Sequence, residues 1–388
     1  MNEFLTRIST LLSKQILFAA MLPCIIFFFA LLAIGIIILG FNNILSFYES
    51  LPTNGVLLTT SGFIFILIIC SYSLHALRDS LLRFWSGSTI SFAWLFWGFE
   101  SREMKRFIKE RKRAESYQYA IDTIEKEFIP DILEFYQADE QKPPIPTNER
   151  KSLLSSIERL SLDPLEVKYK DVLENVYSAY ERFAVDSLSD VYESLRHWHE
   201  IFKIKNQARV AFFDRSFGSV GTIRGTALGN IIQSYNEYCA KRYNIEAEIF
   251  WPRLQSLLND WYKGQIDDQR NTLDFAVISC TLSCVFSLVC LAGPFIYSSD
   301  YLWWIVISGG FVVGHLYYRM AISAADTLGH LVRTCYDLYR LKLIKELSLE
   351  FPTTTANERS LWTKYSQFVT FGGTAVDLNL KDYDKENP

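Results

Sequence analysis

The residues best suited to chemistry in this chain are two histidines beside a carboxylate, His197, His199 and Glu200. Imidazole and carboxylate groups are common zinc ligands, and two histidines on a helix share one metal ion when they lie four positions apart. His197 and His199 lie two positions apart, which turns them about 200° around a helix axis. We therefore predict ordinary surface histidines that bind no metal, with a metal site as the alternative.

Catalytic and cofactor-binding patterns do not stand out elsewhere in the sequence. We find no Ser/His/Asp order and no pair of carboxylates with catalytic spacing. The glycines before Asn230 lack the Lys-Ser/Thr pair of a phosphate-binding loop. Five of the seven cysteines lie in apolar runs and no CxxC pair occurs, so neither a disulfide framework nor a zinc site is expected. We predict a protein that is not an enzyme and has no cofactor.

Two ionisable residues, His315 and Arg319, fall in a long apolar run. An ionisable side chain inside a membrane span is by default a candidate for ion or proton passage. The alternative is that Arg319 reaches back to the lipid headgroups while His315 packs in its neutral form against another helix. Gly310 and Gly314 in the same run form a GxxxG motif, which permits close packing either between two copies or within one chain.

These residues belong to a chain whose apolar residues are concentrated in blocks. Hydrophobic residues make up 49% and charged residues 21% of the sequence. Four blocks are long enough to cross a hydrocarbon core of about 30 Å. They cover about 16–41, 56–74, 275–297 and 302–320. We predict an all-α polytopic membrane protein with four transmembrane helices, arranged as two hairpins in contact with membrane lipids.

The charged residues predict how the chain is threaded. Neither short linker between paired spans contains Lys or Arg, whereas a basic run follows the first hairpin: Arg102, Lys105, Arg106, Lys109, Arg111, Lys112 and Arg113. Positive charge is typical of the cytoplasmic side, which places both termini and the polar middle there. Such a run could also bind nucleic acid or anionic lipids, but a net charge of −4 gives no reason to expect nucleic-acid binding across the chain.

The spans divide the chain into five segments. We predict an N-terminal hairpin (1–83), an interfacial aromatic segment (84–99), a helical cytoplasmic domain (100–272), a second hairpin (273–320) and a helical cytoplasmic C-terminal extension and tail (321–388).

Helical spacing of apolar residues covers 101–137 and 164–204, and the second stretch could be one helix or two. The run 209–213, RVAFF, is the one short segment that could be a strand. A helix that begins at Trp251 is expected to run on into the third span. The fourth span is expected to continue beyond Met320 as a stalk.

Motifs around the third and fourth spans resemble those of a family of uncharacterised bacterial multi-span membrane proteins. That family carries a PTRLGN-like turn, then RYG followed by Ile or Leu and Asp, and then WPRL. The counterparts here are Leu228-Gly229-Asn230, Arg242-Tyr243-Asn244-Ile245-Glu246 and Trp251-Pro252-Arg253-Leu254, with Asp337-Leu338-Tyr339-Arg340 further on. This chain departs from the family in having Gly225 in place of proline before the turn. Gly87 matches the glycine of the family's EGYW motif, but the acid and the aromatic residues of that motif are absent.

The resemblance implies a bacterial inner-membrane location and brings no known activity. It suggests structural or docking roles for its motif residues: Gly229, Asn230, Arg242, Tyr243, Trp251, Arg253, Asp337 and Arg340. We hypothesise that Arg242 and Arg253 pair with carboxylates such as Glu246 or Asp337 and so dock the middle domain on the C-terminal stalk.

Together these patterns favour a membrane protein whose cytoplasmic helical domain senses or docks a protein partner and is coupled to an anchor or a pore, as a homo-oligomer. By analogy of architecture alone, effectors of bacterial stress or phage-defence systems are built in this way. The alternative is an ion channel or transporter, although the spans hold few ionisable residues and show no inverted repeat. A membrane enzyme of unknown type is the third reading.

Overall fold

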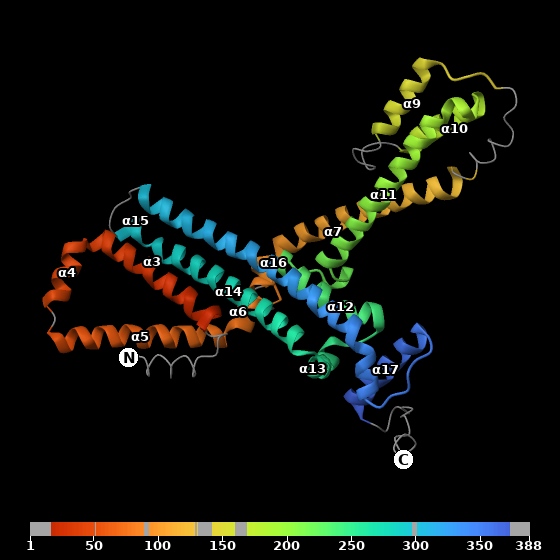
Figure 1. Ribbon diagram of the computed structural model, residues 1–388. Coiled ribbons are helices and arrows are strands. Elements are labelled where there is room, and N and C mark those ends of the chain that lie inside the picture. The colour runs from red at the N-terminus through yellow and green to blue at the C-terminus, as the bar shows by residue number, and fades with distance from the viewer. Residues whose placement is uncertain are drawn as a thin grey trace, which may run out of the picture. The chain divides into compact units, whose positions relative to one another are not determined.

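The computed structural model describes residues 17–50, 52–88, 93–128, 130, 142–159, 169–296 and 301–372, and this part of the chain is all-helical (Figure 1). The predicted fold class, all-α with four helices that can cross a membrane, is confirmed. The chain divides into two compact units, one formed by 1–100 with 218–388 and the other by 101–217.

Four long apolar helices dominate the first unit: α3 (Leu22–Leu39), α5 (Thr53–Ala76), α14 (Asp260–Cys290) and α16 (Tyr301–Glu346). A π-helical turn, η1 (Leu17–Met21), precedes α3, while α4 (Phe41–Ser50) links α3 to α5. All four are long and apolar enough to span a membrane. Their outward apolar side chains, such as Phe29 and Leu58 at 66% and 74% exposure, suit contact with lipid rather than water.

The pair α14 and α16 forms the centre of this unit, and the short helix α15 (Gly293–Ile296) lies at its far end (Figure 1). A Cβ atom on Gly310 would lie 2.2 Å from the Ser287 hydroxyl oxygen, and one on Gly314 would lie 3.2 Å from the Cys284 sulfur. The two glycines therefore let α16 approach α14 closely. The GxxxG motif packs helices within this chain, which is one of the two roles that its sequence permits.

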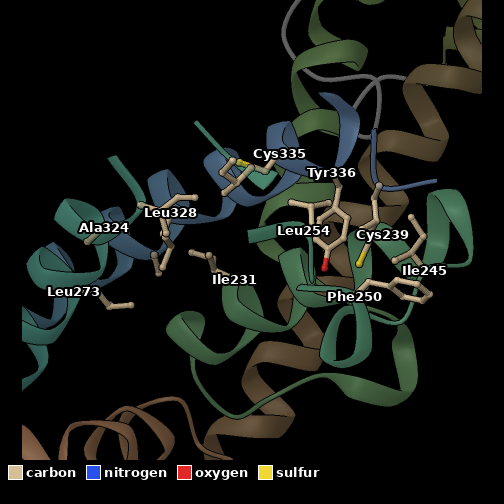
Figure 2. Packing of buried hydrophobic residues seen from close by; sticks show 14 of the residues in the cluster. Ile231, Cys239, Ile245, Phe250, Leu254, Leu273, Ala324, Leu328, Cys335 and Tyr336 are labelled. Carbon is tan, nitrogen blue, oxygen red and sulfur yellow. The ribbon is translucent and has the colours of Figure 1, made fainter. Parts of the chain in front are cut away.

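Four further helices complete the unit: α6 (Arg78–Trp85), α12 (Ala227–Tyr243), α13 (Ala247–Leu257) and α17 (Thr355–Phe371), with a 3₁₀ turn η5 (Val220–Thr222) before α12. Their apolar faces bury one core together with α14 and the C-terminal half of α16 (Figure 2). Phe250, Leu254, Tyr336 and Trp362 are each at most 1% exposed. Burying residues of this size is the main stabilising contribution to the packing of these helices.

The prediction that one helix runs from Trp251 into the third span is wrong. Pro252 lies inside α13, which ends at Leu257, and α14 begins separately at Asp260. The cause of the break is local, because the Asn259 side chain accepts a hydrogen bond from the Tyr262 backbone N–H at 2.9 Å. Asn is among the strongest helix N-caps, so Asn259 starts a new helix where the apolar pattern alone suggests continuity.

The second unit holds most of α7 (Ala93–Thr123), with η3 (Ile124–Phe128), α9 (Thr147–Arg159), α10 (Tyr169–Arg182), η4 (Val185–Leu188) and α11 (Ser189–Ser216). The stretch 164–204 is thus two helices, as far as it is described. The core of the second unit includes Ile157, Val176, Tyr180 and Leu195, each at most 2% exposed.

The prediction that 209–213 could be a strand is also wrong, because these residues belong to α11. Phe213 packs against Phe107 of α7 with ring centroids 5.0 Å apart. On α11 the long helical stripe that includes Leu195 and Phe202 outweighs the strand preference of this short run. The predicted interfacial segment is described only in part, since residues 89–92 lie outside the described residues. The same holds for 131–137 of the first helical stretch and for 164–168 of the second.

Candidate functional site

The helix α16 is the element shared by the apolar helices and the packed helices beyond them. Its 46 residues are continuous, as the sequence pattern of a stalk predicts. The C-terminal half carries Ala324, Ala325, Leu328, Cys335, Leu343 and Ile344 into the common core. Small residues permit close packing here too, because a Cβ on Gly329 would lie 2.8 Å from the ring of Tyr235 in α12. The helices α12 and α16 are therefore in direct contact at this position.

A polar cluster fixes the end of α12 to α16, and we call it the anchor cluster: Tyr238, Tyr243, Asp337, Arg340 and Glu358. The hydroxyl groups of Tyr238 and Tyr243 donate to the Asp337 carboxylate at 3.0 Å and 2.6 Å. Arg340 lies 4.3 Å above the Tyr243 ring and pairs with Glu358 of α17 at 2.9 Å. Burial, followed by the hydrogen bond to Asp337, raises the pKa of Tyr238, so its hydroxyl keeps its proton at neutral pH.

The C-terminal end of α12 is also tied to α17. Asn244 ends α12 in the left-handed conformation with φ of 65°, and its side chain donates to the Thr363 hydroxyl at 2.6 Å. Arg359 donates to the backbone carbonyls of Arg242 and Lys241 at 3.2 Å and 2.5 Å. A guanidinium at this position satisfies the last carbonyl groups of α12, which have no partner within the helix.

The N-terminal end of α12 rests on the turn that follows α6. A Cβ atom on Gly229 would lie 2.0 Å from the Ser86 carbonyl oxygen, so only glycine fits this contact. The buried Asn230 side chain accepts from the Arg224 N–H at 2.7 Å and donates to the Arg224 carbonyl at 3.1 Å. Trp85 of α6 in turn donates to Thr281 of α14 at 2.9 Å. The Gly229–Ser86 contact and the Trp85–Thr281 hydrogen bond together link α12, the turn after α6 and α14.

A row of alternating charges joins α6 to α14 near the same place. Arg78 lies 3.6 Å from Asp274 and 3.9 Å from Asp79, and Arg270 lies 3.6 Å from Asp79. Asp274 is almost fully buried, with a side chain 5% exposed. The row connects the two apolar hairpins through ionic contacts, of which only the Asp274 end is shielded from solvent.

A cavity of about 750 Å³ opens between α6, α12, α13, α14 and α16. Tyr235, Trp251 and Tyr336 supply aromatic walls, and Asp274 and Arg270 supply charged groups. The Tyr336 ring lies 5.8 Å from the Trp251 ring, and its hydroxyl points toward the Cys239 sulfur (Figure 2). A concave space of this size with a few polar groups is typical of a small-molecule site.

The structure brings Arg242, Tyr243, Asp337 and Arg340 together at the C-terminal end of α12, and it places Gly229 and Asn230 at the other end. Arg253 donates to the Ile249 carbonyl within its own helix at 2.5 Å, rather than to Glu246 or Asp337. Trp251 lines the cavity. His315 and Arg319 lie exposed on the apolar half of α16, away from these contacts.

Sequence reasoning missed Tyr238, Glu358 and Arg359 as parts of the anchor and capping contacts. Tyr238 and Asp337 are 99 residues apart, and Arg359 and Arg242 are 117 apart. Local spacing carries no signal for such pairs. The available clue was the resemblance, whose matched motifs include Arg242-Tyr243, Asp337-Leu338-Tyr339-Arg340 and also Glu358-Arg359.

His199 in the second unit is buried, 4% exposed, and is not the surface histidine that we predicted. It lies 3.3 Å from Glu125, which pairs with Lys203 at 2.6 Å, while His197 is exposed. Burial lowers the pKa of His199, so it is neutral near pH 7. No group of three or more potential metal ligands occurs among the described residues.

Comparison of the chain with protein families, with curated proteins and with solved structures finds no match in any of the three.

Proposed function

We propose that this protein is a non-enzymatic membrane protein of the bacterial inner membrane, in which helices outside the spans bind a partner and pass the resulting movement to the spans. The observation that carries the proposal is the continuity of α16 from its apolar half to the anchor cluster. A helix without a break transmits a shift along its axis instead of absorbing it at a hinge. The family resemblance supports the bacterial inner-membrane location.

The distribution of charge supports the orientation. The basic residues of 102–113 follow the first hairpin, and Lys342 and Lys345 follow the apolar half of α16. By the positive-inside rule both termini and the helices α12, α13 and α17 then face the cytoplasm. The partner would be a cytoplasmic or membrane protein, and self-association into a homo-oligomer would let several α16 helices move together.

Two contacts connect the partner-binding helices to the spans. The anchor cluster holds α12 and α17 on α16, and the Gly229 contact holds the start of α12 on α6. Because α6 follows α5 and donates to α14 through Trp85, both hairpins are reached from the single helix α12. A partner that displaces α12 would act on both hairpins at once.

Purification from native membranes tests the proposal. Wild-type protein and the Asp337→Asn variant would be isolated in mild detergent after chemical cross-linking, with Asp267→Asn as a control on an exposed carboxylate of α14. We expect a stoichiometric partner with the wild type and the control, and a several-fold loss with Asp337→Asn. Equal recovery of that partner with Asp337→Asn, or no specific partner with the wild type, would count against docking.

An ion channel or transporter is the second candidate. A smaller cavity of about 300 Å³ lies between α3, α14 and α16, and its mostly apolar lining includes Ser279, Ser283 and Tyr317. Serine hydroxyls within a span are potential contacts for a passing ion or solute. Ion flux into liposomes that contain the purified protein, together with absence of a partner, would favour this candidate over the first.

A further inference from the structure

The cavity between α6, α12, α13, α14 and α16 has the size and wall chemistry of a ligand site. Its volume of about 750 Å³ lies within the range of about 300–1,000 Å³ that is usual for sites of drug-sized molecules. Apolar wall is provided by Leu273 of α14 with Leu328 and Val332 of α16. Such a mixed wall suits a molecule with an apolar body and a small number of polar groups.

Acidic groups outnumber basic ones in the wall. Five carboxylates line it, against the guanidinium groups of Arg224 and Arg270: Asp79, Glu237, Glu246, Glu248 and Asp274. Three of the five have a charged partner or several donors, because Asp79 pairs with Arg270, Asp274 lies 3.6 Å from Arg78, and Glu237 accepts from Ser219, Gln233 and Lys241. Glu246 and Glu248 hold no ion pair within the part of the chain that the structure describes. The free charge of the cavity is therefore negative.

Asp274 gives an independent reason to expect a cationic ligand. Its side chain is 5% exposed, and its Oδ2 atom accepts no hydrogen bond from any described residue. Arg78 is 3.6 Å away, which is longer than an N–H···O hydrogen bond. A buried carboxylate oxygen without a donor is costly, and a donor carried by a ligand would relieve that cost.

An aromatic ring fits the same kind of ligand. Tyr235 lines the cavity together with Arg270 and Asp274, and the face of an aromatic ring attracts an organic cation. A bare metal ion fits less well, because three or more close ligating side chains are not found among the described residues. We propose that this cavity binds a small organic cation, a protonated amine that donates to Asp274 and packs its apolar body against Leu273 and Leu328.

Calorimetric titration of the full chain in detergent micelles tests the proposal with three probes of one shape. Benzylamine is protonated at neutral pH, benzyl alcohol is neutral and benzoate is negative, and protein-free micelles correct for partitioning. We expect saturable binding of benzylamine and at least tenfold weaker binding of the other two. Binding should weaken about tenfold or more in Asp274→Asn, since a charge-assisted hydrogen bond is lost.

Two further variants keep the test decisive. Asp267→Asn makes the same change on an exposed residue of α14 outside the cavity and should bind benzylamine as the wild type does. Glu248→Gln changes an exposed carboxylate of the wall and should weaken binding several-fold without disturbing the fold. Equal binding of benzyl alcohol, stronger binding of benzoate, or unchanged binding of benzylamine in both Asp274→Asn and Glu248→Gln would overturn the proposal. Binding in micelles requires no transmission to the spans, so the result is independent of the proposed function.

Discussion

Gly229 shows most clearly how one residue positions several helices. No side chain fits between its Cα atom and the Ser86 carbonyl oxygen, because a Cβ would lie 2.0 Å from that backbone atom. Gly229→Ala should therefore separate α12 from the turn after α6 and destabilise the first unit by about 1–3 kcal/mol or more, as overpacking does. The midpoint of thermal unfolding in detergent micelles measures this loss.

Gly264→Ala provides the matched control for that prediction. A Cβ on Gly264 would have no neighbour within 4 Å, and the residue lies within α14. Alanine is the better helix former by about 0.5–1 kcal/mol, so this variant should unfold at the wild-type temperature or slightly above it. A Gly229→Ala protein as stable as Gly264→Ala would contradict the contact with Ser86.

Glu237 makes the stability of α12 depend on pH. Burial, the largest contribution, raises its pKa, but hydrogen bonds from Thr222, Gln233, Ser219 and Lys241 together lower the pKa to about 2 from an ordinary value of 4.5. Because the folded-state pKa lies below that of the unfolded chain, the stabilisation is complete above about pH 4.5 and is lost as pH falls toward about 2.

The variant Glu237→Gln removes this titration. Between about pH 5 and pH 3 its unfolding midpoint should fall less than that of the wild type, since glutamine has no proton to gain. The comparison uses circular dichroism in detergent at each pH. Parallel curves for the two proteins would show that Glu237 contributes no pH-dependent stability.

At the scale of elements, the contact between α12 and α16 depends on a small residue facing an aromatic ring. A Cβ on Gly329 would lie 2.8 Å from the Tyr235 ring, whereas one on Gly309 of the same helix would meet nothing within 4 Å. Gly329→Ala should loosen α12 and increase the rate at which protease cleaves 218–258 several-fold. Gly309→Ala is the control, and equal cleavage of both variants would show that Gly329 is not needed for this packing.

The elements also show what the sequence could predict. Four helices long and apolar enough to cross a membrane, and the continuity of α16, were foreseen because length, hydropathy and helical spacing are local properties. The break between α13 and α14 was not foreseen, because the N-cap Asn259 lies inside an otherwise helical stretch. The RVAFF run was misjudged, since its three β-prone residues, Val210, Phe212 and Phe213, were weighed without the helix to which they belong.

The candidate site was less predictable than the spans. The motif residues Tyr243, Asp337 and Arg340 were selected through the resemblance. The partner of Asp337, Tyr238, lies on α12 and the partner of Arg340, Glu358, lies on α17, so no local spacing connects them to α16. Arg253, expected in the same contact, satisfies a carbonyl of its own helix instead. Asn244 adopts the left-handed conformation, which asparagine tolerates better than most residues.

At the scale of the whole molecule, the first unit combines four apolar helices with a packed layer of shorter ones, and α14 and α16 belong to both. The anchor cluster and the Gly229 contact connect that layer to each hairpin. The proposed function depends on this continuity. If the layer moved without affecting α14, the spans would act only as an anchor.

Hydrogen–deuterium exchange in lipid nanodiscs tests this point most directly, using a variant that carries both Tyr243→Phe and Asp337→Asn. The variant removes the hydroxyl donor and the carboxylate acceptor of the anchor cluster. Transmission predicts several-fold faster exchange in α12 that extends along α16 over 321–346 and into α14 over 260–280. Faster exchange confined to α12 and α17, with α14 unchanged, would contradict the account.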